Sequence, residues 1–321
     1  MVDVIIIGAG PSGISCAIAA QKAGLDYLVL EKGVLVNSIY NFPVNMIFFS
    51  TSQKLEIGQV PFISHQDKPT RAEALEYYRR LWLDLNLNIH TNEKVLSVEG
   101  NNLDFCVKTE KNEYRTKKVI VATGFYDHYN ALNIPGENLP KVKHYYDEAH
   151  HYINKNVIVV GSANSACDVA LECYQKGAKV TMVIRESELY QKVKYWILPN
   201  IENRISEGSI KVFFNSELIE INPAKVVIKT PERIVELDND YVLAMTGYKP
   251  DYQFFEKLGI SIGNDEYHTP FYNIDSMECS RSGMYLCGVI LAGMHTSKLF
   301  IENTRDHGYI IINDILKGLS E

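Results

Sequence analysis

The residues best suited to chemistry in this sequence are three glycines that follow a β-branched run near the N-terminus. Gly8, Gly10 and Gly13 come directly after the apolar residues 4–7, and Glu31 closes the next apolar run. In this spacing the first glycine permits a tight turn, the second lets a phosphate approach the backbone, and the third lets helix and strand pack closely. The helix that follows points its N–H groups at a pyrophosphate, and the acid binds ribose hydroxyls. The pattern predicts a dinucleotide site, because a purely structural glycine turn requires neither helix nor acid.

A second glycine turn lies near the middle of the chain. Residues 156–160 and 179–184 have the pattern of two strands, and Gly161 opens the turn between the first of them and a helix. Ala163 replaces the second glycine, so a pyrophosphate must sit slightly farther from this backbone or find other contacts. Arg185 follows the second strand, where a guanidinium suits the 2′-phosphate of NADP. The residues expected at this nucleotide are Gly161, Ser162, Ala163, Asn164, Ser165 and Arg185, while Lys192 and Lys194 either add charge or belong to a solvated surface.

Thiol chemistry is a further possibility that the residue types offer. The six cysteines form no CxxC pair and no spacing typical of a metal site, so neither a disulfide framework nor a metal centre is predicted. Cys16 lies one helical turn after Ser12, close to the expected phosphates, and is the candidate for a catalytic thiol. The alternative is a buried, inert thiol that serves only in packing.

Composition excludes several other classes of function. The 321 residues are 46% apolar and 22% charged, which is near the globular average and sufficient for two cores of common size. A net charge of −7 leaves no general basic surface for nucleic acid or an anionic membrane. No apolar run reaches the length of a membrane span, and residues 1–3 lead directly into a predicted core strand. We therefore expect a cytoplasmic protein without a signal peptide.

The elements that must position these residues follow from hydrophobic periodicity. Residues 70–85 predict an amphipathic helix opened by a Thr70 cap. Strands are expected near 88–91, 93–99, 103–109, 113–116, 119–124 and 241–247, and the last two, which both contain Thr-Gly, are expected to be the crossings between domains. The sequence thus predicts an α/β protein with two Rossmann-like, three-layer ββα nucleotide-binding domains. The expected boundaries are 1–120 with 248–321 for the first domain and 121–247 for the second.

Two glycine turns in separate domains, the two Thr-Gly strand ends and the chain length together resemble the low-molecular-weight thioredoxin reductase-like flavoproteins. The resemblance covers nearly the whole sequence. It implies that the first domain holds FAD, the inserted domain holds NADPH, and the C-terminal segment returns to complete the FAD site. It also implies that Gly288 and Val289 lie beside the flavin, although many members carry aspartate at the second position. The redox CxxC of true thioredoxin reductases is absent from the corresponding stretch, residues 144–151, so a dithiol relay to thioredoxin is not expected.

Longer strings support a narrower match. The segments that resemble the YpdA-like bacillithiol-disulfide (bacilliredoxin) reductases are residues 38–43, 48–62, 196–199, 288–293, 300–303 and 307–308. That family uses FAD and NADPH and lacks CxxC. The resemblance implies a homodimer that passes electrons from NADPH through FAD to a low-molecular-weight or protein disulfide. Many members carry a cysteine directly before the third glycine of the first turn, whereas this chain has Ser12, which removes the thiol that would meet the disulfide.

The remaining candidates surround the expected flavin. The C-terminal stretch is apolar apart from a few polar residues, which either bind flavin atoms or make caps and internal hydrogen bonds: His295, Thr296, Glu302, Asn303 and His307. Tyr40, Phe49 and Tyr126 either stack on the flavin or pack in the core. The full set expected at the cofactors, besides the second glycine turn, is Gly8, Gly10, Pro11, Ser12, Gly13, Glu31, Lys32, Tyr40, Phe49, Val95, Ala122, Thr123, Gly124, Thr246, Gly247, Gly288, Val289, His295 and Thr296.

Two other functions share these features. A ferredoxin or flavodoxin–NADP reductase has the same architecture and needs no cysteine pair. A flavin-bearing redox sensor would bind FAD and turn over slowly. Screening of electron acceptors separates the first from a disulfide reductase, whereas negligible NADPH consumption with every acceptor would favour the second.

Overall fold

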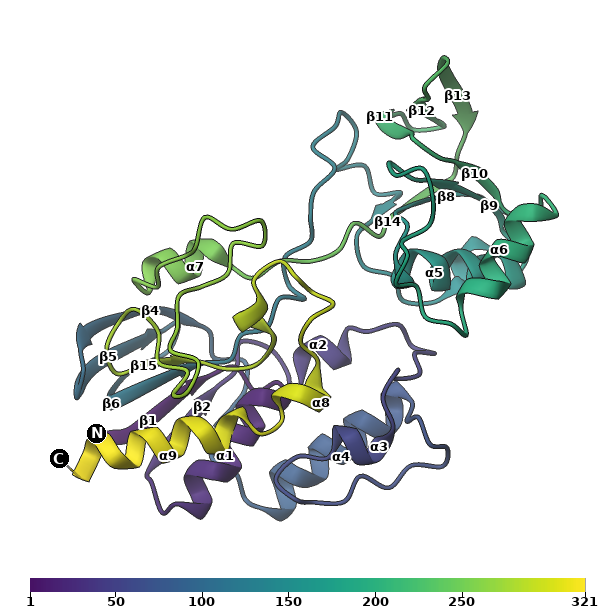
Figure 1. Cartoon of the computed structure of the whole chain (residues 1–321). Helices are drawn as coiled ribbons and strands as arrows, with labels where there is room; N and C mark the ends of the chain where they lie inside the picture. The colour runs from purple at the N-terminus through teal and green to yellow at the C-terminus, as the bar shows by residue number, and fades with distance from the viewer. Residues whose placement is uncertain (321) are drawn as a thin grey trace. The chain divides into compact units, whose positions relative to one another are not determined.

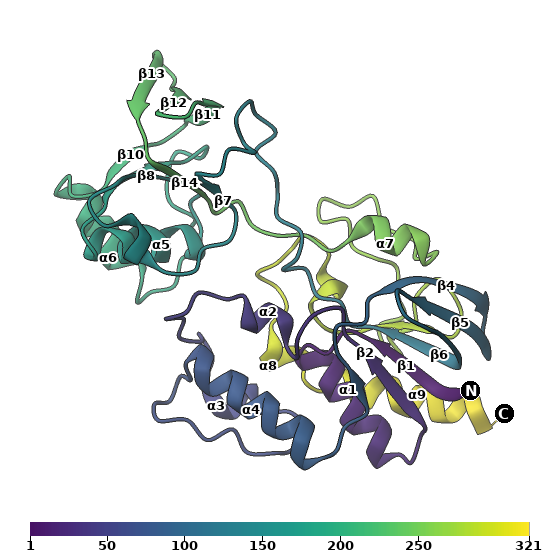
Figure 2. The same cartoon turned by 180° about the vertical axis from the view of Figure 1, so that it is seen from behind.

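The chain crosses twice between two structural units, which Figures 1 and 2 show from opposite sides. The computed structural model describes residues 1–320. Unit 1 combines Met1–His128 with the chain from Tyr248 onward, and unit 2 is the inserted Tyr129–Gly247. The first crossing lies after His128 rather than after residue 120, because the end of a strand at Val121 and the turn behind it still belong to unit 1.

Unit 1 is built on a mixed sheet with the strand order β3-β2-β1-β6-β5-β4, and β15 also pairs with β6. The strands are β1 (Val2–Ile7), β2 (Tyr27–Leu30), β3 (Ile89–His90), β4 (Val95–Asn101), β5 (Asp104–Thr109), β6 (Glu113–Val121) and β15 (Met284–Leu286). β3, β2, β1, β6 and β15 pair in parallel, whereas β4 and β5 pair antiparallel with each other and β5 with β6. The carboxyl ends of the parallel strands therefore share one edge, which is where such sheets bind ligands.

β6 is one continuous strand, and the expectation of two separate strands at 113–116 and 119–124 was wrong. Its first half alternates in burial and pairs with antiparallel β5, whereas its last four residues are all buried and pair in parallel. Two lysines interrupt the apolar pattern. Lys117 forms an ion pair with Asp3 at 2.8 Å, and the Lys118 amine bonds Asn102 at 2.8 Å, so both charges are accommodated without breaking the strand.

The helices of unit 1 cover this sheet. They are α1 (Pro11–Lys22), α2 (Asn37–Tyr40), α3 (Ser52–Leu55), α4 (Arg71–Asp84), α7 (Tyr252–Lys257), the 3₁₀ turn η2 (Gly288–Ala292), α8 (Ile301–Thr304) and α9 (His307–Ser320). The predicted helix with a Thr70 cap is confirmed as α4, whose capping box joins Thr70 and Glu73. α9 lies alongside α1 (Figure 1), and Gly308 makes this possible because a Cβ there would come 2.6 Å from the Ser15 backbone.

Unit 2 carries a parallel sheet in the order β10-β9-β8-β14-β7 and a separate antiparallel sheet in the order β11-β12-β13. Its elements are β7 (Val142–Lys143), η1 (Ala149–Tyr152), β8 (Asn156–Val160), α5 (Asn164–Gln175), β9 (Lys179–Val183), α6 (Leu198–Ser206), β10 (Lys211–Phe213), β11 (Glu217–Ile221), β12 (Lys225–Lys229), β13 (Ile234–Asp238) and β14 (Tyr241–Ala244). Each unit thus has a parallel strand-turn-helix-strand arrangement, which confirms the predicted α/β fold class. No helix of the described chain is long and apolar enough to cross a membrane.

Candidate functional site

The first glycine turn is closed by the protein on two sides and open on a third. Gly8 has φ +107° and lies so close to β6 that a Cβ would be 2.5 Å from the Ala122 carbonyl oxygen. A Cβ on Gly13 would collide with the Gly8 carbonyl, so this glycine brings α1 against the end of β1. A Cβ on Gly10, by contrast, would meet no atom within 4 Å. Since Gly10 is the N-cap of α1 and makes no side-chain cap, the open side is where a phosphate can approach the helix N-terminus.

Glu31 lies at the end of β2 and is almost completely buried. Its Oε2 accepts the Ala9 N–H at 2.8 Å and its Oε1 accepts the Gly33 N–H at 2.9 Å. Burial raises the pKa of Glu31 even though both hydrogen bonds act to lower it. Each carboxylate oxygen can accept a second bond, so the side chain is oriented by the turn and still able to bind ribose hydroxyls. Lys32, next in the chain, forms an ion pair with Asp127 at 2.8 Å.

The residues after β6 and β15 complete this region of unit 1. Thr123 follows Ala122, and its hydroxyl is buried without a hydrogen-bond partner in the described chain. A buried orphan hydroxyl is uncommon, and a bound dinucleotide offers the polar atoms that would satisfy it. Gly124 has φ +68°, which makes the turn that leaves the sheet. Three features fit the FAD that the motif predicts: the close packing at Gly8 and Gly13, the open space beside Gly10, and the unsatisfied hydroxyl of Thr123.

Ser12 lies where the returning C-terminal segment meets the glycine turn. A Cβ on Gly288, which has φ +84°, would be 2.5 Å from the Ser12 hydroxyl oxygen. The Ser12 hydroxyl is 3.3 Å from that of Thr304, which itself donates to the Phe300 carbonyl at 2.8 Å. Ser12 is therefore the donor in the first bond. The sequence contained no signal for the role of Thr304, because the bond joins residues 292 positions apart.

His307 holds the other side of the same turn. Its Nδ1 accepts the Gly288 N–H at 3.2 Å, and the ring also hydrogen-bonds the Asn303 backbone. Burial lowers the pKa of His307 to about 4, so the ring is neutral at physiological pH and can act as the acceptor. The sequence singled out His307 as a polar residue of a possible flavin site. In the structure it instead fixes the backbone conformation of Gly288, the residue that the resemblance places beside the flavin.

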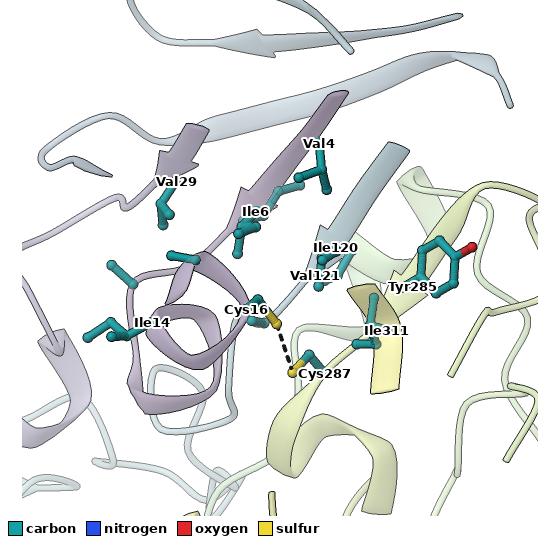
Figure 3. Close-up of a cluster of buried hydrophobic side chains, with 14 of the residues drawn as sticks. Val4, Ile6, Ile14, Cys16, Val29, Ile120, Val121, Tyr285, Cys287 and Ile311 are labelled. Carbon is teal, nitrogen blue, oxygen red and sulfur yellow. Dashed lines mark hydrogen bonds between the residues drawn. The ribbon is translucent and has the colours of Figure 1, made fainter. Parts of the chain in front are cut away.

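Cys16, the candidate catalytic thiol, is completely buried on α1. Its sulfur lies 3.4 Å from that of Cys287 at the end of β15, and Figure 3 shows the pair among apolar core side chains. The bond to Cys16 and burial hold the pKa of the Cys287 thiol well above its usual range. This environment supports the alternative of an inert packing thiol, because attack on a disulfide requires an accessible thiolate.

The other expected contacts are scattered over unit 1. Tyr40 is 52% exposed and lies under the Arg71 guanidinium, 5.7 Å from the ring centre. His295 stacks on Tyr267 with ring centres 4.5 Å apart. Val95 is buried at the start of β4. Those that are half-buried are Pro11, Phe49, Tyr126, Val289 and Thr296. Direct contact of these residues with the cofactor stays a prediction.

The second glycine turn has the same construction in unit 2. Gly161 has φ +129°, and a Cβ there would be 2.6 Å from the Met245 carbonyl oxygen of the strand end. Ala163 is the N-cap of α5 and makes no side-chain cap, while the Ser165 side chain is exposed in its first turn. Thr246 precedes Gly247 at the crossing, and its hydroxyl donates to the Asn130 carbonyl at 2.5 Å. Because Ala163 makes no side-chain cap, no capping side chain occupies the backbone N–H groups at the start of α5.

A loop after β9 folds back over this turn. Asn164 Oδ1 accepts the Lys194 N–H at 2.9 Å, and Ser162 Oγ donates to Glu186 at 3.3 Å. Arg185 is exposed and has no ion-pair partner within the described residues. Its guanidinium therefore stays available for an anionic ligand, and its contact with a 2′-phosphate stays a prediction. Lys192 is also exposed, whereas Lys194 lies 6.0 Å from the Trp196 ring centre.

Comparison with known proteins gives matches over the whole chain. The model of the family described as pyridine nucleotide-disulphide oxidoreductase matches residues 5–288. The sequence is 45% identical over 315 residues to the bacilliredoxin reductase Bdr of Bacillus subtilis, covering 98% of this chain and 97% of that protein. The structure is similar to the bacillithiol disulfide reductase Bdr (YpdA) of Staphylococcus aureus, with a TM-score of 0.96, 41% identity and 99% and 98% of the two chains covered. Thioredoxin reductase of Lactococcus lactis, at 22% identity and a TM-score of 0.78 over 100% of this chain and 99% of that one, shares the fold.

Proposed function

This chain belongs to the pyridine nucleotide-disulphide oxidoreductase family, and on that basis we propose that it transfers electrons from NADPH through FAD to a bacillithiol-type disulfide. The acceptor is either the low-molecular-weight disulfide itself or a bacilliredoxin that carries the thiol. The observation that carries the proposal is the 45% identity to a bacilliredoxin reductase over 98% of this chain. The chain is an oxidoreductase that uses a flavin and a nicotinamide coenzyme, and FAD supplies the two-electron relay between donor and acceptor.

Unit 1 is the proposed FAD-binding domain. The open side at Gly10 accommodates the pyrophosphate, and Glu31 binds the ribose of the adenosine half. Gly288 and its neighbour Val289 return next to Ser12, where the flavin half of the cofactor is expected. Unit 2 is the proposed NADPH-binding domain, in which the N-terminus of α5 binds the pyrophosphate and Arg185 binds the 2′-phosphate.

Ser12 determines whether a mixed disulfide between protein and substrate can form beside the flavin site. A serine hydroxyl cannot form a mixed disulfide, and Cys16 is buried. We therefore propose that disulfide reduction proceeds without a covalent protein–thiol intermediate at position 12. We further propose a cytoplasmic location, since all six cysteines are free, as is usual in a reducing compartment. The resemblance to the reductase family supports the proposal of a homodimer.

The test uses the purified protein loaded with FAD. NADPH consumption is followed with bacillithiol disulfide, a bacillithiol-modified bacilliredoxin, cystine and ferredoxin as acceptors. We expect rapid flavin reduction by NADPH and sustained consumption with at least one of the two bacillithiol substrates. Consumption with ferredoxin alone would instead identify a ferredoxin–NADP reductase, and reduction without turnover on any acceptor would identify a redox sensor.

A further inference from the structure

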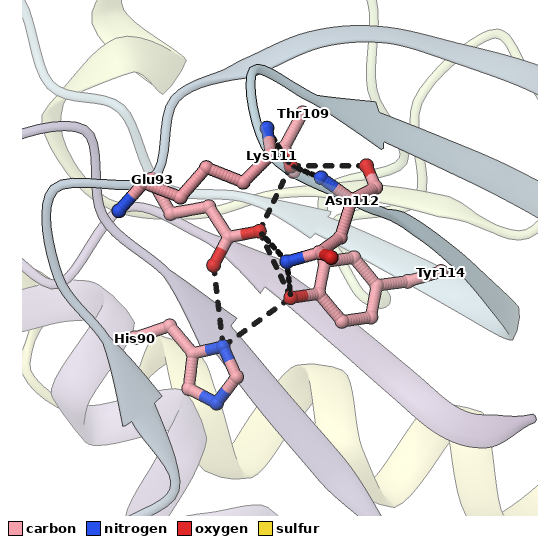
Figure 4. Close-up of polar contacts among 6 residues, drawn as sticks. All are labelled: His90, Glu93, Thr109, Lys111, Asn112 and Tyr114. Atoms are coloured by element: carbon pink, nitrogen blue, oxygen red, sulfur yellow. Dashed lines mark hydrogen bonds and ion pairs between the residues drawn. The ribbon is translucent and has the colours of Figure 1, made fainter.

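A buried carboxylate lies close to the proposed adenosine end of the FAD site. Glu93 is 4% exposed, and its Oε1 accepts hydrogen bonds from Thr109 at 2.8 Å, Tyr114 at 2.8 Å and Asn112 at 3.3 Å. His90 Nδ1 lies 3.3 Å from its Oε2. Figure 4 shows these side chains converging on the Glu93 carboxylate from the two ends of the β5–β6 hairpin turn and from β3. Since a carboxylate only accepts, His90 carries its proton on Nδ1 in this arrangement.

The backbone around Glu93 is paired with the turn that contains Glu31. The Glu31 N–H donates to the His90 carbonyl at 2.9 Å, and the Glu93 N–H donates to the Glu31 carbonyl at 2.8 Å. The Asn92 N–H closes the ladder on the Gly33 carbonyl at 2.8 Å. Gly33 is also one of the two donors that orient the Glu31 carboxylate. The segment around Glu93 is therefore hydrogen-bonded both to Glu31 and to Gly33, one of the residues that orient the Glu31 carboxylate.

The β5–β6 hairpin could close without a charged side chain at position 93. An isolated buried ion is unfavourable, and apolar residues of similar volume commonly fill such positions without loss of stability. Burial raises the pKa of Glu93, but the hydrogen bonds from Thr109, Tyr114 and Asn112 outweigh it and leave the pKa below its ordinary value. The carboxylate is therefore ionised, with its position set by donors on three strands, β3, β5 and β6, and on the β5–β6 turn.

We propose that Glu93 is a positioning residue for the adenosine half of FAD. Through the backbone ladder it sets the Glu31 carboxylate, and it fixes the start of β4 at Val95, two residues later in the chain. The flavin half is expected at a different part of unit 1, around Ser12 and Gly288, so its binding should not depend on Glu93. The inference rests on the proposed function only in that FAD, rather than another dinucleotide, occupies this site.

The test compares FAD with FMN, which lacks the adenosine half. Flavin-free wild-type protein and the Glu93→Gln variant are titrated with each flavin, and flavin fluorescence quenching gives the dissociation constants. We expect Glu93→Gln to weaken FAD binding about tenfold, as loss of a charged hydrogen-bond acceptor would, and to leave FMN binding unchanged. Glu99→Gln is the matched control, since Glu99 lies on β4, the strand that begins two residues after Glu93, but is exposed and forms an ion pair with Lys108 at 2.7 Å.

A role limited to stability would produce a different result. It would change the affinities for FAD and FMN by the same factor, and this outcome would overturn the inference, as would unchanged FAD affinity. If Glu93→Gln does not fold, Tyr114→Phe removes a single donor to Glu93 and retains the ring, and the same selective loss of FAD affinity is expected. Wild-type protein that binds no flavin would refute the proposed function, whereas normal FAD binding by both variants would refute only the role of Glu93.

Discussion

At the scale of single residues, Ser12 is the position where one atom changes the available chemistry. Replacement of its hydroxyl by a thiol would place sulfur at the N-terminus of α1, where the helix dipole lowers thiol pKa values. Gly288 leaves room for it, because the glycine has no Cβ to meet the side chain. We predict that Ser12→Cys raises bacillithiol-disulfide turnover by about tenfold, equivalent to ~1.4 kcal/mol in the barrier, measured as NADPH consumption.

The matched control for this prediction is Cys16→Ala. Because Cys16 is completely buried beside Cys287, its removal should leave turnover unchanged. A large loss in Cys16→Ala would show that the buried thiol takes part in the reaction. A Ser12→Cys variant no faster than wild type would show that the serine does not limit disulfide reduction.

Arg185 is the residue that we expect to distinguish the two nicotinamide coenzymes. A guanidinium binds the dianionic 2′-phosphate through charge-assisted bonds, typically worth about 1.5–3 kcal/mol. Arg185→Ala should therefore raise KM for NADPH by roughly 10- to 100-fold and leave KM for NADH almost unchanged. Steady-state kinetics with both coenzymes provide the measurement. Arg233→Ala, another exposed arginine of unit 2, should change neither.

The sequence could identify residues whose role follows from local geometry, but not those whose role depends on distant pairing. Gly8 and Gly13 were predicted because close approach near a strand end has a fixed spacing. Thr304 and Glu93 were not, because their partners become neighbours only after β15 has joined the sheet and β4–β6 have paired. The only signal for His307 was that it is a polar residue in an apolar segment. Such a position indicates that the side chain is buried and hydrogen-bonded, but it does not identify the hydrogen-bond partner.

At the scale of elements, the junction between η2 and α9 depends on a neutral histidine. The pKa of His307 is lowered to about 4 by burial, against an ordinary value of about 6.5. As the pH falls, His307 is therefore protonated in the unfolded chain before it is protonated in the folded protein. Its contribution to the free energy of unfolding is fully present above pH 6.5 and is lost as the pH falls toward 4. The difference corresponds to roughly 3 kcal/mol of unfolding free energy.

His307→Gln tests this prediction, because the amide oxygen can still accept the Gly288 N–H but does not titrate. The unfolding free energy, measured by urea denaturation at several values between pH 7 and 4.5, should fall less steeply in the variant than in wild type. His151→Gln serves as the control, since it makes the same substitution at a histidine whose side chain is 61% exposed. Parallel curves for wild type and His307→Gln would contradict the prediction.

Elements were predictable where one environment extends along their length. α4 shows a capping signal and an amphipathic pattern, and it begins and ends within one residue of the expected range. β6 passes from a half-exposed antiparallel layer into a buried parallel layer, so its pattern changes midway and was interpreted as two strands. The first crossing lies several residues beyond the strand end at Val121, because the turn that follows β6 still packs with unit 1, as far as His128.

At the scale of the whole molecule, the division into two units with separate cores has a thermodynamic consequence. Each unit buries its own apolar cluster, with Val4 and Ile120 in that of unit 1 and Ile158 and Val242 in that of unit 2. A ligand stabilises the folded state that binds it, by about 2.7 kcal/mol at a hundredfold excess over Kd. A ligand confined to one unit should therefore protect that unit against local unfolding.

We predict that 2′,5′-ADP, which carries the 2′-phosphate without the nicotinamide, slows hydrogen exchange in β8 and α5 but not in β1 and α1. Its adenosine and phosphates are expected to bind at the second glycine turn and Arg185, whereas added FAD should protect β1 and α1 of a flavin-free preparation. Exchange measured by mass spectrometry on peptides from each unit provides the comparison. Arg185→Ala should abolish the effect of 2′,5′-ADP and preserve that of FAD. Equal protection of both units by either ligand would show that the two nucleotide sites are not assigned to separate units.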